Sequence, residues 1–295
     1  MEAMQKIKCL TIEDSNFPDR LRKLSGMPKK LYYIGNLPDP KKPAAAVVGA
    51  RMCSPYGRCQ AFKYARTMAS YGVQIISGMA RGIDAEGHKG ALDTDTPTFA
   101  VLGKRSGRVL SQFQQMALSA DPGKKAAGSS ASFPQGSPPV NWAFPARNRI
   151  ISGLSDAVLV VEAKEQSGSL ITANFALEHG HSVYALPGAV TEELSRGCNK
   201  LIFDGAGIAY SPEIMLMEWG IEAKNRPQNV EKKKLGLAPD LDLVYSCLDL
   251  RPENLDNLIR KTGFSASKVC ALLTELQLMG LVGETGRQYY RISGG

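Results

Sequence analysis

Short apolar runs recur along residues 45–185 and alternate with longer segments that predict helices. The apolar runs lie at Ala45–Val48, Val73–Ile76, Thr98–Leu102, Ala157–Val161 and Ser182–Ala185. The predicted helices are Tyr56–Tyr71, Ile83–Leu92 and Gly168–His179. Short β-branched runs separated by helices are typical of parallel strands that are buried on both faces. The pattern therefore predicts an α/β fold, a Rossmann-like parallel sheet covered by helices on both faces.

The pattern changes on either side of this domain, which we predict to span residues 45–224. Residues 1–44 form a short lead-in, and the charged residues 225–239 form a linker. Over residues 240–295, amphipathic helices are predicted at Leu255–Thr262 and Ser267–Met279, followed by a hairpin through Gly286. Two helices and a hairpin in this order predict a small winged-helix domain. Such domains bind DNA or contact proteins, and the few cations near these helices leave both roles open.

The segment Lys104–Ser132 departs from the surrounding pattern. It has no strand signal and is rich in Ser, Gln, Ala, Gly and Lys. A structureless loop of this length is uncommon inside an α/β domain. The segment is therefore either a flexible surface insertion or the translation of a shifted reading frame.

Composition adds a weak preference for an anionic partner. The 295 residues include 36 Lys and Arg against 28 Asp and Glu, a net charge of +8. An excess of this size favours nucleic acid only in combination with motifs. The six cysteines have no paired spacing, and three histidines are too few for a histidine-rich metal site. We therefore expect a cytoplasmic protein with reduced thiols, no metal and no cofactor. No apolar run reaches the ~20 residues of a membrane span.

Three segments place glycine beside arginine next to an apolar run: Ala46–Arg51, Ser77–His88 and Phe144–Gly153. Glycine lets a backbone approach a phosphate closely, and arginine binds a phosphate through two parallel hydrogen bonds. We expect the three segments to be loops that converge on one edge of the sheet. Their repetition predicts a groove for a polyanion rather than a pocket with one reactive group.

The predicted binding residues follow strands or precede helices, where backbone N–H groups suit an anion. One of the two arginines in the third segment is expected to bind the anion, and the other to pair with Asp84 or Glu162. The tryptophan and phenylalanine before them, Trp142 and Phe144, are candidates for base stacking or for core packing. The full set of predicted binding residues is Gly49, Arg51, Ser77, Gly78, Arg81, Gly82, Arg147, Asn148, Arg149, Ser167 and Gly168.

Titratable residues near these segments are expected to be structural. Asp84 lies at a predicted helix start, where its carboxylate is expected to interact favourably with the helix dipole or to pair with an arginine. His88 lies one turn further on and is expected to be a packed or capping residue rather than a base. The sequence therefore predicts no catalytic residue.

The motifs together resemble the DprA/Smf DNA-processing family. Five of them occur in family order: Val47–Arg51, Ser77–His88, Phe144–Ser155, Val161–Ala173 and Ala185–Gly188. The resemblance implies a Rossmann-like dimer that binds single-stranded DNA, protects incoming DNA during natural transformation and loads the RecA recombinase onto it. Members of the family are not known as catalysts. Ala50 replaces the small hydroxyl residue usual in the first motif, so one hydroxyl contact to phosphate is absent.

Two other functions fit parts of the sequence. One is a nucleotide-processing enzyme of the phosphoribohydrolase type, in which a Pro-Gly-Gly loop holds a nucleoside monophosphate. In this chain, Ala189 stands where that loop has its second glycine, and Glu162 and Glu165 would have to be the catalytic carboxylates. The other is a winged-helix regulator with a ligand-sensing Rossmann domain.

The shifted-frame explanation makes a prediction about the gene. Lys104–Ala117 can be encoded so that a shift of one nucleotide reads Asn-Gly-Val-Asp-Val-Phe-Tyr-Pro-Ser-Ser-Asn-Lys-Trp-Leu. This hidden peptide resembles what the family carries after its Val-Leu-Gly strand. We expect sequencing of the gene to show codons compatible with the shifted reading. Incompatible codons would rule out the frameshift.

Overall fold

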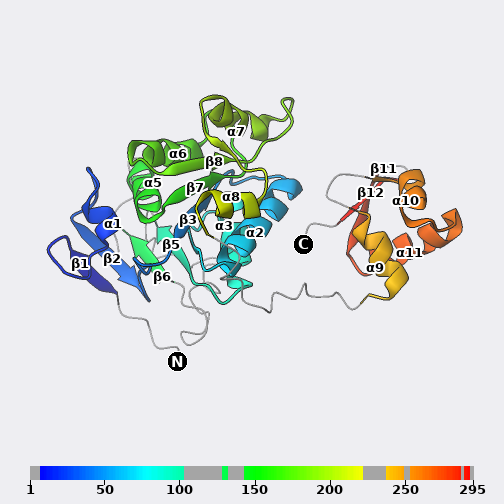
Figure 1. Ribbon diagram of the computed structural model, residues 1–295, viewed down its shortest axis with the longest axis horizontal. Helices are drawn as coiled ribbons and strands as arrows, with labels where there is room; N and C mark the ends of the chain where they lie inside the picture. The colour runs from blue at the N-terminus through cyan, green and yellow to red at the C-terminus, as the bar shows by residue number, and fades with distance from the viewer. Residues whose placement is uncertain are drawn as a thin grey trace. The chain divides into compact units, whose positions relative to one another are not determined.

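The computed structural model describes residues 7–102, 128–131, 143–221, 237–248, 253–286 and 289–292. The chain divides into two units, Met1–Pro227 and Gln228–Gly295. Each unit has its own sheet and its own hydrophobic core (Figure 1). Because the cores are separate, the contacts within each unit account for its fold.

The first unit alternates strands and helices along most of its length. In chain order, its elements are β1 (Lys8–Thr11), α1 (Asp19–Arg22), β2 (Lys30–Ile34), β3 (Ala44–Val48), α2 (Pro55–Ser70), β4 (Gln74–Ser77), α3 (Ile83–Leu92), β5 (Thr98–Leu102), β6 (Gly128–Ala131), α5 (Ala143–Leu154), β7 (Ala157–Val160), α6 (Gly168–Glu178), β8 (Ser182–Ala185), α7 (Glu193–Phe203), β9 (Gly207–Ile208) and α8 (Pro212–Glu218).

Parallel pairing runs through most of the main sheet. Among the described residues the sheet has nine strands, in the order β1-β2-β6-β5-β4-β3-β7-β8-β9. Neighbours from β6 to β9 are parallel, whereas β2 pairs antiparallel with β6 and β1 antiparallel with β2. Ala45 of β3 is in register with Ile75 on one side and with Ala157 on the other. The sheet therefore grows outward from β3 in both directions.

Alternate residues of the central strands pack into two different cores. Ala44, Ala46 and Val48 of β3 face a core completed by α1, α5, α6 and α7. Ala45 and Val47 face the opposite core, which α2, α3 and α8 complete. Successive side chains of a strand point to opposite faces, so a run that is apolar throughout needs cover on both. Helices provide that cover (Figure 1), which confirms the predicted Rossmann-like α/β fold.

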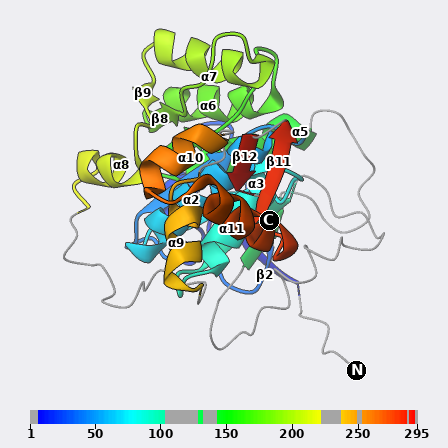
Figure 2. The same cartoon turned by 90° about the vertical axis from the view of Figure 1, so that its right-hand side faces the viewer.

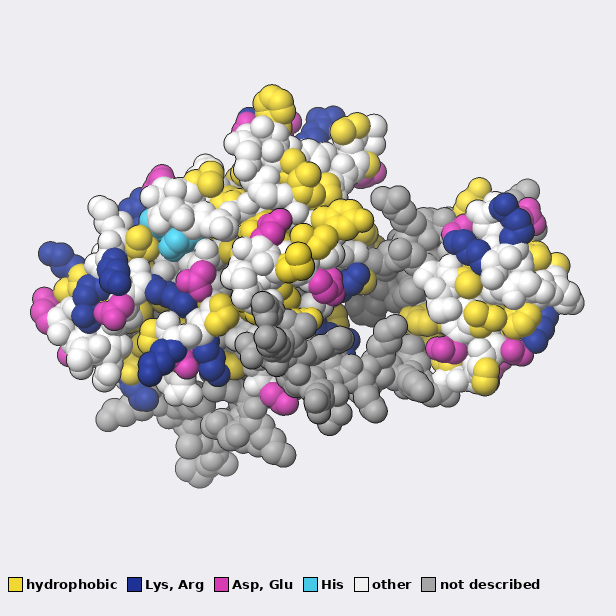
Figure 3. Space-filling view, in the orientation of Figure 1, with side chains coloured by type: hydrophobic (Ala, Val, Ile, Leu, Met, Phe, Trp, Pro, Cys, Tyr) yellow, Lys and Arg dark blue, Asp and Glu magenta, His cyan; other side chains and the backbone are white. Residues whose placement is uncertain are grey.

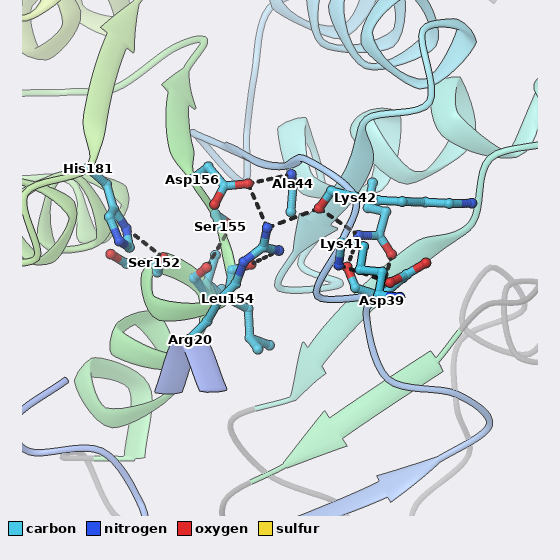
Figure 4. Close-up of polar contacts among 12 residues, drawn as sticks. Arg20, Asp39, Lys41, Lys42, Ala44, Ser152, Leu154, Ser155, Asp156 and His181 are labelled. Atoms are coloured by element: carbon cyan, nitrogen blue, oxygen red, sulfur yellow. Dashed lines mark hydrogen bonds and ion pairs between the residues drawn. The ribbon is translucent and has the colours of Figure 1, made fainter. Parts of the chain in front are cut away.

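Residues 8–34, which lie within the predicted lead-in, contribute two strands and a helix to the first unit. Arg20 of α1 donates from Nη2 to the Lys42 carbonyl oxygen and to Asp156 Oδ2, both at 2.9 Å (Figure 4). Asp156 Oδ2 also accepts from the Ala44 amide at 2.8 Å. These bonds hold α1 against the first residue of β3 and the residue that precedes β7.

The expectation that Lys104–Ser132 contains no strand is wrong for four residues, because Gly128–Ala131 forms β6. This strand pairs in parallel with β5 and antiparallel with β2, so both of its backbone edges are hydrogen-bonded. Backbone pairing does not require an apolar sequence, and the short run Gly-Ser-Ser-Ala therefore has no recognisable pattern. Residues 104–127 and 132 lie outside the described residues, so the insertion and the shifted frame both remain predictions.

The second unit is a winged helix, as predicted (Figure 2). Its core contains buried apolar residues from all three of its described helices. Asn254 caps α10 by accepting from the Asn257 amide at 2.8 Å, and Gly263 ends that helix with a φ of 70°. The elements are α9 (Pro239–Ser246), β10 (Glu253–Asn254), α10 (Leu255–Thr262), α11 (Ala266–Leu278), β11 (Val282–Gly286) and β12 (Tyr289–Ile292), with strand order β10-β12-β11.

His88 on α3 is fully buried in the first unit. Its Nδ1 lies 2.7 Å from Oγ1 of Thr98 at the start of β5, so His88 is a packed residue, as predicted. Burial and, to a smaller extent, the positive charge of Arg147 lower the pKa of His88 from 6.5 to about 4. The folded chain therefore holds this imidazole neutral at pH values where the unfolded chain would protonate it.

We expect His88 to make the free energy of unfolding depend on pH between about 4 and 6.5. The contribution of His88 to the free energy of unfolding is complete above its pKa in the unfolded chain. That contribution is lost as the pH falls towards its pKa in the folded chain, because the unfolded state then binds the extra proton. The shift corresponds to about 3 kcal/mol. Urea unfolding followed by tryptophan fluorescence measures it, since Trp142 and Trp219 both belong to the first unit.

The matched variant is His88→Gln, in which the side chain cannot titrate. The slope of the unfolding free energy against pH should be flatter for this variant than for the wild type between about 4 and 6.5. A profile as steep as that of the wild type would show that other groups cause the pH dependence.

Candidate functional site

The direction of chain growth changes at β3, which makes its carboxyl end a natural binding site. From β3 the chain continues through β4 and β5 on one side, whereas β7, β8 and β9 are added on the other. The connection after β3 leads to α2 on one face of the sheet, and the connection after β7 leads to α6 on the opposite face. The two connections diverge and leave a crevice, where open α/β sheets bind ligands.

A cavity of about 220 Å³ occupies this crevice, and we refer to it as the switch-point pocket. Two arginines and one aspartate line it, which leaves one unit of positive charge. A larger cavity of about 470 Å³ lies beside α1 and the antiparallel pair of β1 and β2, and none of the predicted binding residues lines that cavity. The residues of the switch-point pocket are Val48, Gly49, Arg51, Ala80, Asp84, Arg147, Asn148, Ser167, Gly168, Ser169, Ile171 and Thr172.

Arg147 of α5 forms the inner wall of the pocket and is held by several acceptors. Its Nε donates to the Val101 carbonyl oxygen at 3.0 Å and its Nη1 to Asn148 Oδ1 at 3.0 Å. Its Nη2 donates to the Gly78 carbonyl oxygen and lies 3.9 Å from Asp84 Oδ2. Arg147 is therefore the arginine that pairs with Asp84, one of the two partners predicted. Burial lowers the pKa of Arg147 from its ordinary value.

Asp84 connects Arg147 to the loop after β4. Its Oδ2 accepts from the Gly78 amide at 3.2 Å and from the Ala80 amide at 3.4 Å. Burial raises the pKa of the Asp84 carboxyl, and Arg147 and the two amides oppose that effect. Between the two amides lies Met79, with a φ of 55°, the one non-glycine residue of the described chain with a positive φ. The carboxylate thus holds a loop in a conformation that non-glycine residues rarely adopt.

The N-terminus of α6 forms the opposite wall. Ser167 caps the helix, since its Oγ accepts from the Ser169 amide at 3.4 Å. Asn148 Nδ2 donates to the Gly168 carbonyl oxygen at 3.1 Å and so fixes α5 against the start of α6. A Cβ at Gly168 would meet no atom within 4 Å, so protein packing does not require glycine there. The glycine leaves the positive end of an α-helix open to a ligand.

Gly49 and Arg51 lie at the pocket in the loop after β3. This loop is fixed by two hydrogen bonds, from the Ala50 amide to the Glu162 carbonyl oxygen at 2.8 Å and from the Ile83 amide to the Ala50 carbonyl oxygen at 3.2 Å. Arg51 is exposed, and its positive charge acts on both members of the buried pair. It opposes the burial that raises the pKa of Asp84 and adds to the burial that lowers the pKa of Arg147. The exposed arginine is therefore placed at the mouth of the pocket and the buried one inside it.

Several predicted binding residues lie next to the pocket without lining it. Ser77 is buried, and its Oγ donates to the Val47 carbonyl oxygen at 2.6 Å, which ties β4 to β3. Gly82 begins α3 with a φ of 77°, and a Cβ there would lie 2.3 Å from the Ala50 carbonyl oxygen. Arg81 is exposed beside it. Gly78 contributes its backbone to the Asp84 and Arg147 hydrogen bonds described above.

The expectation that Phe144–Gly153 is a loop is wrong, because these residues lie in helix α5. Residues two apart on an α-helix point about 200° apart. Arg149 therefore leaves the pocket that Arg147 lines, and instead lies over the Phe175 ring and 3.8 Å from Glu178 Oε2. Phe144 is in the first turn of this helix. Trp142 lies outside the described residues.

Ala80, Ile171 and Thr172 line the pocket but were not predicted. Ile171 and Thr172 are three and four residues after Gly168, so they share its face of α6. That spacing could have identified them once Gly168–His179 was predicted to be a helix. The sequence does not mark Ala80 as a binding residue, because only the conformation of its loop brings it to the cavity.

Glu162 and Glu165, the carboxylates that the phosphoribohydrolase alternative requires, do not line the pocket. Glu162 is buried and holds the start of α2, where its side chain accepts from the Ser54 amide at 2.9 Å and from the Ser54 hydroxyl. Glu165 is exposed. The Gly188 amide donates to Asn199 Oδ1 at 3.2 Å, in a loop that does not line the pocket.

Within the described ranges, no three His, Cys, Asp or Glu side chains gather as metal ligands do. No helix there is both long and apolar enough to cross a bilayer. The polar side chains of the switch-point pocket are arginine, aspartate, asparagine, serine and threonine.

Known proteins resemble this chain over both of its units. The sequence profile of DNA recombination-mediator protein A matches residues 8–220, and that of the DprA winged helix domain matches residues 230–285. The DNA processing protein DprA of Streptococcus pneumoniae is 39% identical over 225 residues, covering 73% of this chain and 75% of the relative. Protein Smf of Escherichia coli is 35% identical over 287 residues, covering 95% of this chain and 76% of the relative.

Two solved structures share the fold of the first unit. The X-ray structure of DprA from Streptococcus pneumoniae aligns with a TM-score of 0.66 at 36% identity, over 72% of this chain and 75% of that one. The structure of DNA processing protein A from Helicobacter pylori, described as a study of its single-stranded DNA binding mode, aligns with a TM-score of 0.61 at 24% identity, over 73% of this chain and 98% of that one. The chain thus belongs to the DNA recombination-mediator protein A family, the DprA/Smf proteins of DNA processing.

Proposed function

We propose that this chain binds single-stranded DNA at the switch-point pocket, protects incoming DNA and loads the RecA recombinase onto it during natural transformation, in the cytoplasm and without catalysis. The observation that carries this proposal is the combination of a net positive pocket with a helix N-terminus left open at Gly168. A relative of the same fold, from Helicobacter pylori, is described as binding single-stranded DNA. Phosphate recognition of this kind is independent of base sequence and sensitive to salt.

The two arginines have different parts in this proposal. Arg147 is 13% exposed in its side chain and already serves protein acceptors, so it supplies a fixed positive charge at the back of the pocket. Arg51 is exposed at the mouth of the pocket. There it can bind the phosphate before or after the one held inside the pocket. The backbone at Gly168 and the Ser167 hydroxyl complete the polar groups on the wall opposite Arg147.

The phosphoribohydrolase alternative has less support. That chemistry needs a carboxylate that can act on the ribose, and Asp84, the carboxylate of the pocket, is engaged by Arg147 and by two backbone amides. Glu162 serves the start of α2 instead. The described residues of the pocket therefore support DNA binding better than hydrolysis of a nucleotide.

A homodimer is part of the proposal, and the edge of the sheet at β9 supports it. β9 is an edge strand, so one side of its backbone is available for pairing. Large apolar side chains are exposed around it on α7, on β9, in the connection from β9 to α8 and on α8, where Figure 3 shows hydrophobic groups gathered. These residues are Phe203 (89% exposed), Ile208 (53%), Tyr210 (77%) and Met217 (76%). A second copy of this chain would bury them.

We expect Arg51→Ala and Gly168→Val each to weaken binding of labelled oligothymidine about tenfold or more, measured by fluorescence anisotropy. Arg51→Ala removes a phosphate contact, so it should also reduce the slope of log K against log salt by about 0.7. Gly168→Val fills the open space at the start of α6, where a Cβ meets no protein atom within 4 Å. Its urea unfolding midpoint should therefore match that of the wild type.

The control for charge is Lys63→Ala, which removes one exposed cation from α2. This variant should bind like the wild type. Duplex DNA and nucleoside monophosphates serve as competitors. Binding of oligothymidine that is unchanged by both pocket variants, or competition by a monophosphate as strong as by oligothymidine, would contradict the proposed function.

We expect Phe203→Glu together with Met217→Glu to convert a dimer into a monomer in sedimentation velocity experiments, because two charges would enter the buried apolar contact. Leu278→Glu is the control, since it places the same charge on an equally exposed apolar residue of α11, 85% exposed. A wild-type chain that sediments as a monomer at every concentration would contradict the dimer. So would a double variant that still sediments as a dimer.

A further inference from the structure

Arg149, which leaves the pocket, begins a row of flat side chains between α5 and α6. Its guanidinium carbon lies 4.4 Å from the centre of the Phe175 ring. The rings of Phe175 and His179 are nearly parallel, with centres 6.4 Å apart and planes at 15°. His179 meets His181 edge-on, with ring centres 5.7 Å apart. We refer to Arg149, Phe175, His179 and His181 as the α5–α6 row.

The row is continuous with the switch-point pocket. At the pocket, Asn148 of α5 contacts Gly168 at the start of α6, and a turn further along α5 Ser152 Oγ lies 3.0 Å from His179 Nδ1 at the end of α6. The two helices therefore run in the same direction side by side. On α6, Ile171 lines the pocket, and Phe175 and His179 follow it at intervals of four residues on the same face. The row thus starts where the pocket ends.

The side chains of the row are held in place yet remain accessible. Ser152 contacts both imidazoles. Its Oγ lies 3.0 Å from His179 Nδ1. Its carbonyl oxygen lies 3.2 Å from His181 Nδ1, a contact that Figure 4 shows. All four residues are half-buried, and histidine side chains reach the surface on the face shown in Figure 3. A planar side chain that is already ordered loses little entropy when a partner stacks on it.

We propose that the α5–α6 row is a second contact surface for single-stranded DNA, on which bases stack as the strand leaves the switch-point pocket. This inference rests on the proposed function. Every base has a flat π face, so stacking on aromatic rings and on arginine needs no particular base sequence. Bases in a duplex are already stacked on one another and do not offer these faces. The row therefore gives the protein its preference for a single strand.

The charges around the row distinguish it from the pocket. Glu178 Oε2 lies 3.8 Å from Arg149 Nη2, so one carboxylate offsets the guanidinium charge. The row thus contributes contact area and π stacking without a net charge for the phosphates. Binding energy from stacking depends weakly on salt, whereas binding energy from phosphate contacts depends strongly on it.

The test compares oligothymidines of about four and about twelve nucleotides, lengths that bracket a short and a long binding site. Phe175→Leu keeps an apolar side chain but removes the flat ring, and Arg149→Gln removes the guanidinium. Each should weaken binding of the longer oligonucleotide about tenfold and change the shorter one less than about twofold. The salt slope of each variant should stay that of the wild type. Phe175→Tyr, which retains a flat ring, should bind like the wild type.

Leu177→Ala is the matched control, because Leu177 is an exposed apolar residue of the same helix, 56% exposed, that lies outside the row. A 2-aminopurine base placed along the longer oligonucleotide reports stacking directly, and its quenching by the wild type should be lost in Phe175→Leu. Urea unfolding by tryptophan fluorescence checks that each variant is folded.

The outcomes separate this inference from the proposed function. If the wild type binds both oligonucleotides and Arg51→Ala weakens both, the proposed function stands. Should Phe175→Leu and Arg149→Gln then bind the longer oligonucleotide as tightly as the wild type, the α5–α6 row is not a DNA contact and only packs α5 against α6. A wild type that binds neither oligonucleotide overturns both proposals.

Discussion

The buried guanidinium of Arg147 is the constraint on which the rest of the site depends. A buried charge that loses its partner destabilises a protein by about 3–5 kcal/mol, so this side chain must be paired and hydrogen-bonded. Its acceptors are the Gly78 and Val101 carbonyl oxygens at the ends of β4 and β5, and Asp84 supplies the opposite charge. The hydrogen bonds of Arg147 to these acceptors place α5 against the ends of two strands, and the neighbouring Asn148 then fixes the start of α6. The shape of the switch-point pocket follows from the requirements of one cation.

The same constraint separates the arginine that supports the fold from the arginines that a ligand can reach. Arg147 cannot turn towards a ligand without abandoning acceptors that are themselves buried, so its role is to keep the pocket positive and rigid. Arg51 and Arg149 have no comparable burial, and one lies at the mouth of the pocket while the other lies along α5. The helical motif Arg-Asn-Arg therefore gives its three side chains three different positions. The first is a buried support, the second is hydrogen-bonded to the start of α6, and the third is a half-buried flat surface over Phe175.

Strands with strong apolar patterns could be predicted from sequence, and strands without one could not. The runs that become β3, β4, β5, β7 and β8 are recognisable because both of their faces are buried. β6 consists of Gly, Ser and Ala and is defined by its two neighbours, so no local signal exists. For the site, glycine and arginine identified the loop after β3 and the start of α6. The helical state of residues 143–154, and with it the divergence of Arg147 and Arg149, could not be predicted, because glycine beside arginine is typical of anion-binding loops and does not indicate a helix.

Among the described residues, no aromatic side chain lines the switch-point pocket, so its polar groups suit a phosphate rather than the face of a base. Phosphate contacts at one point cannot tell a single strand from a duplex, because both present the same backbone. Discrimination has to come from bases, and bases need flat surfaces beside the place where the backbone is held. The parallel arrangement of α5 and α6 meets that need, since each helix contributes one wall of the pocket and then continues into the α5–α6 row. Where a polyanion is anchored by a rigid cation and a helix N-terminus, selectivity for single strands therefore depends on what the two helices present beyond the anchor.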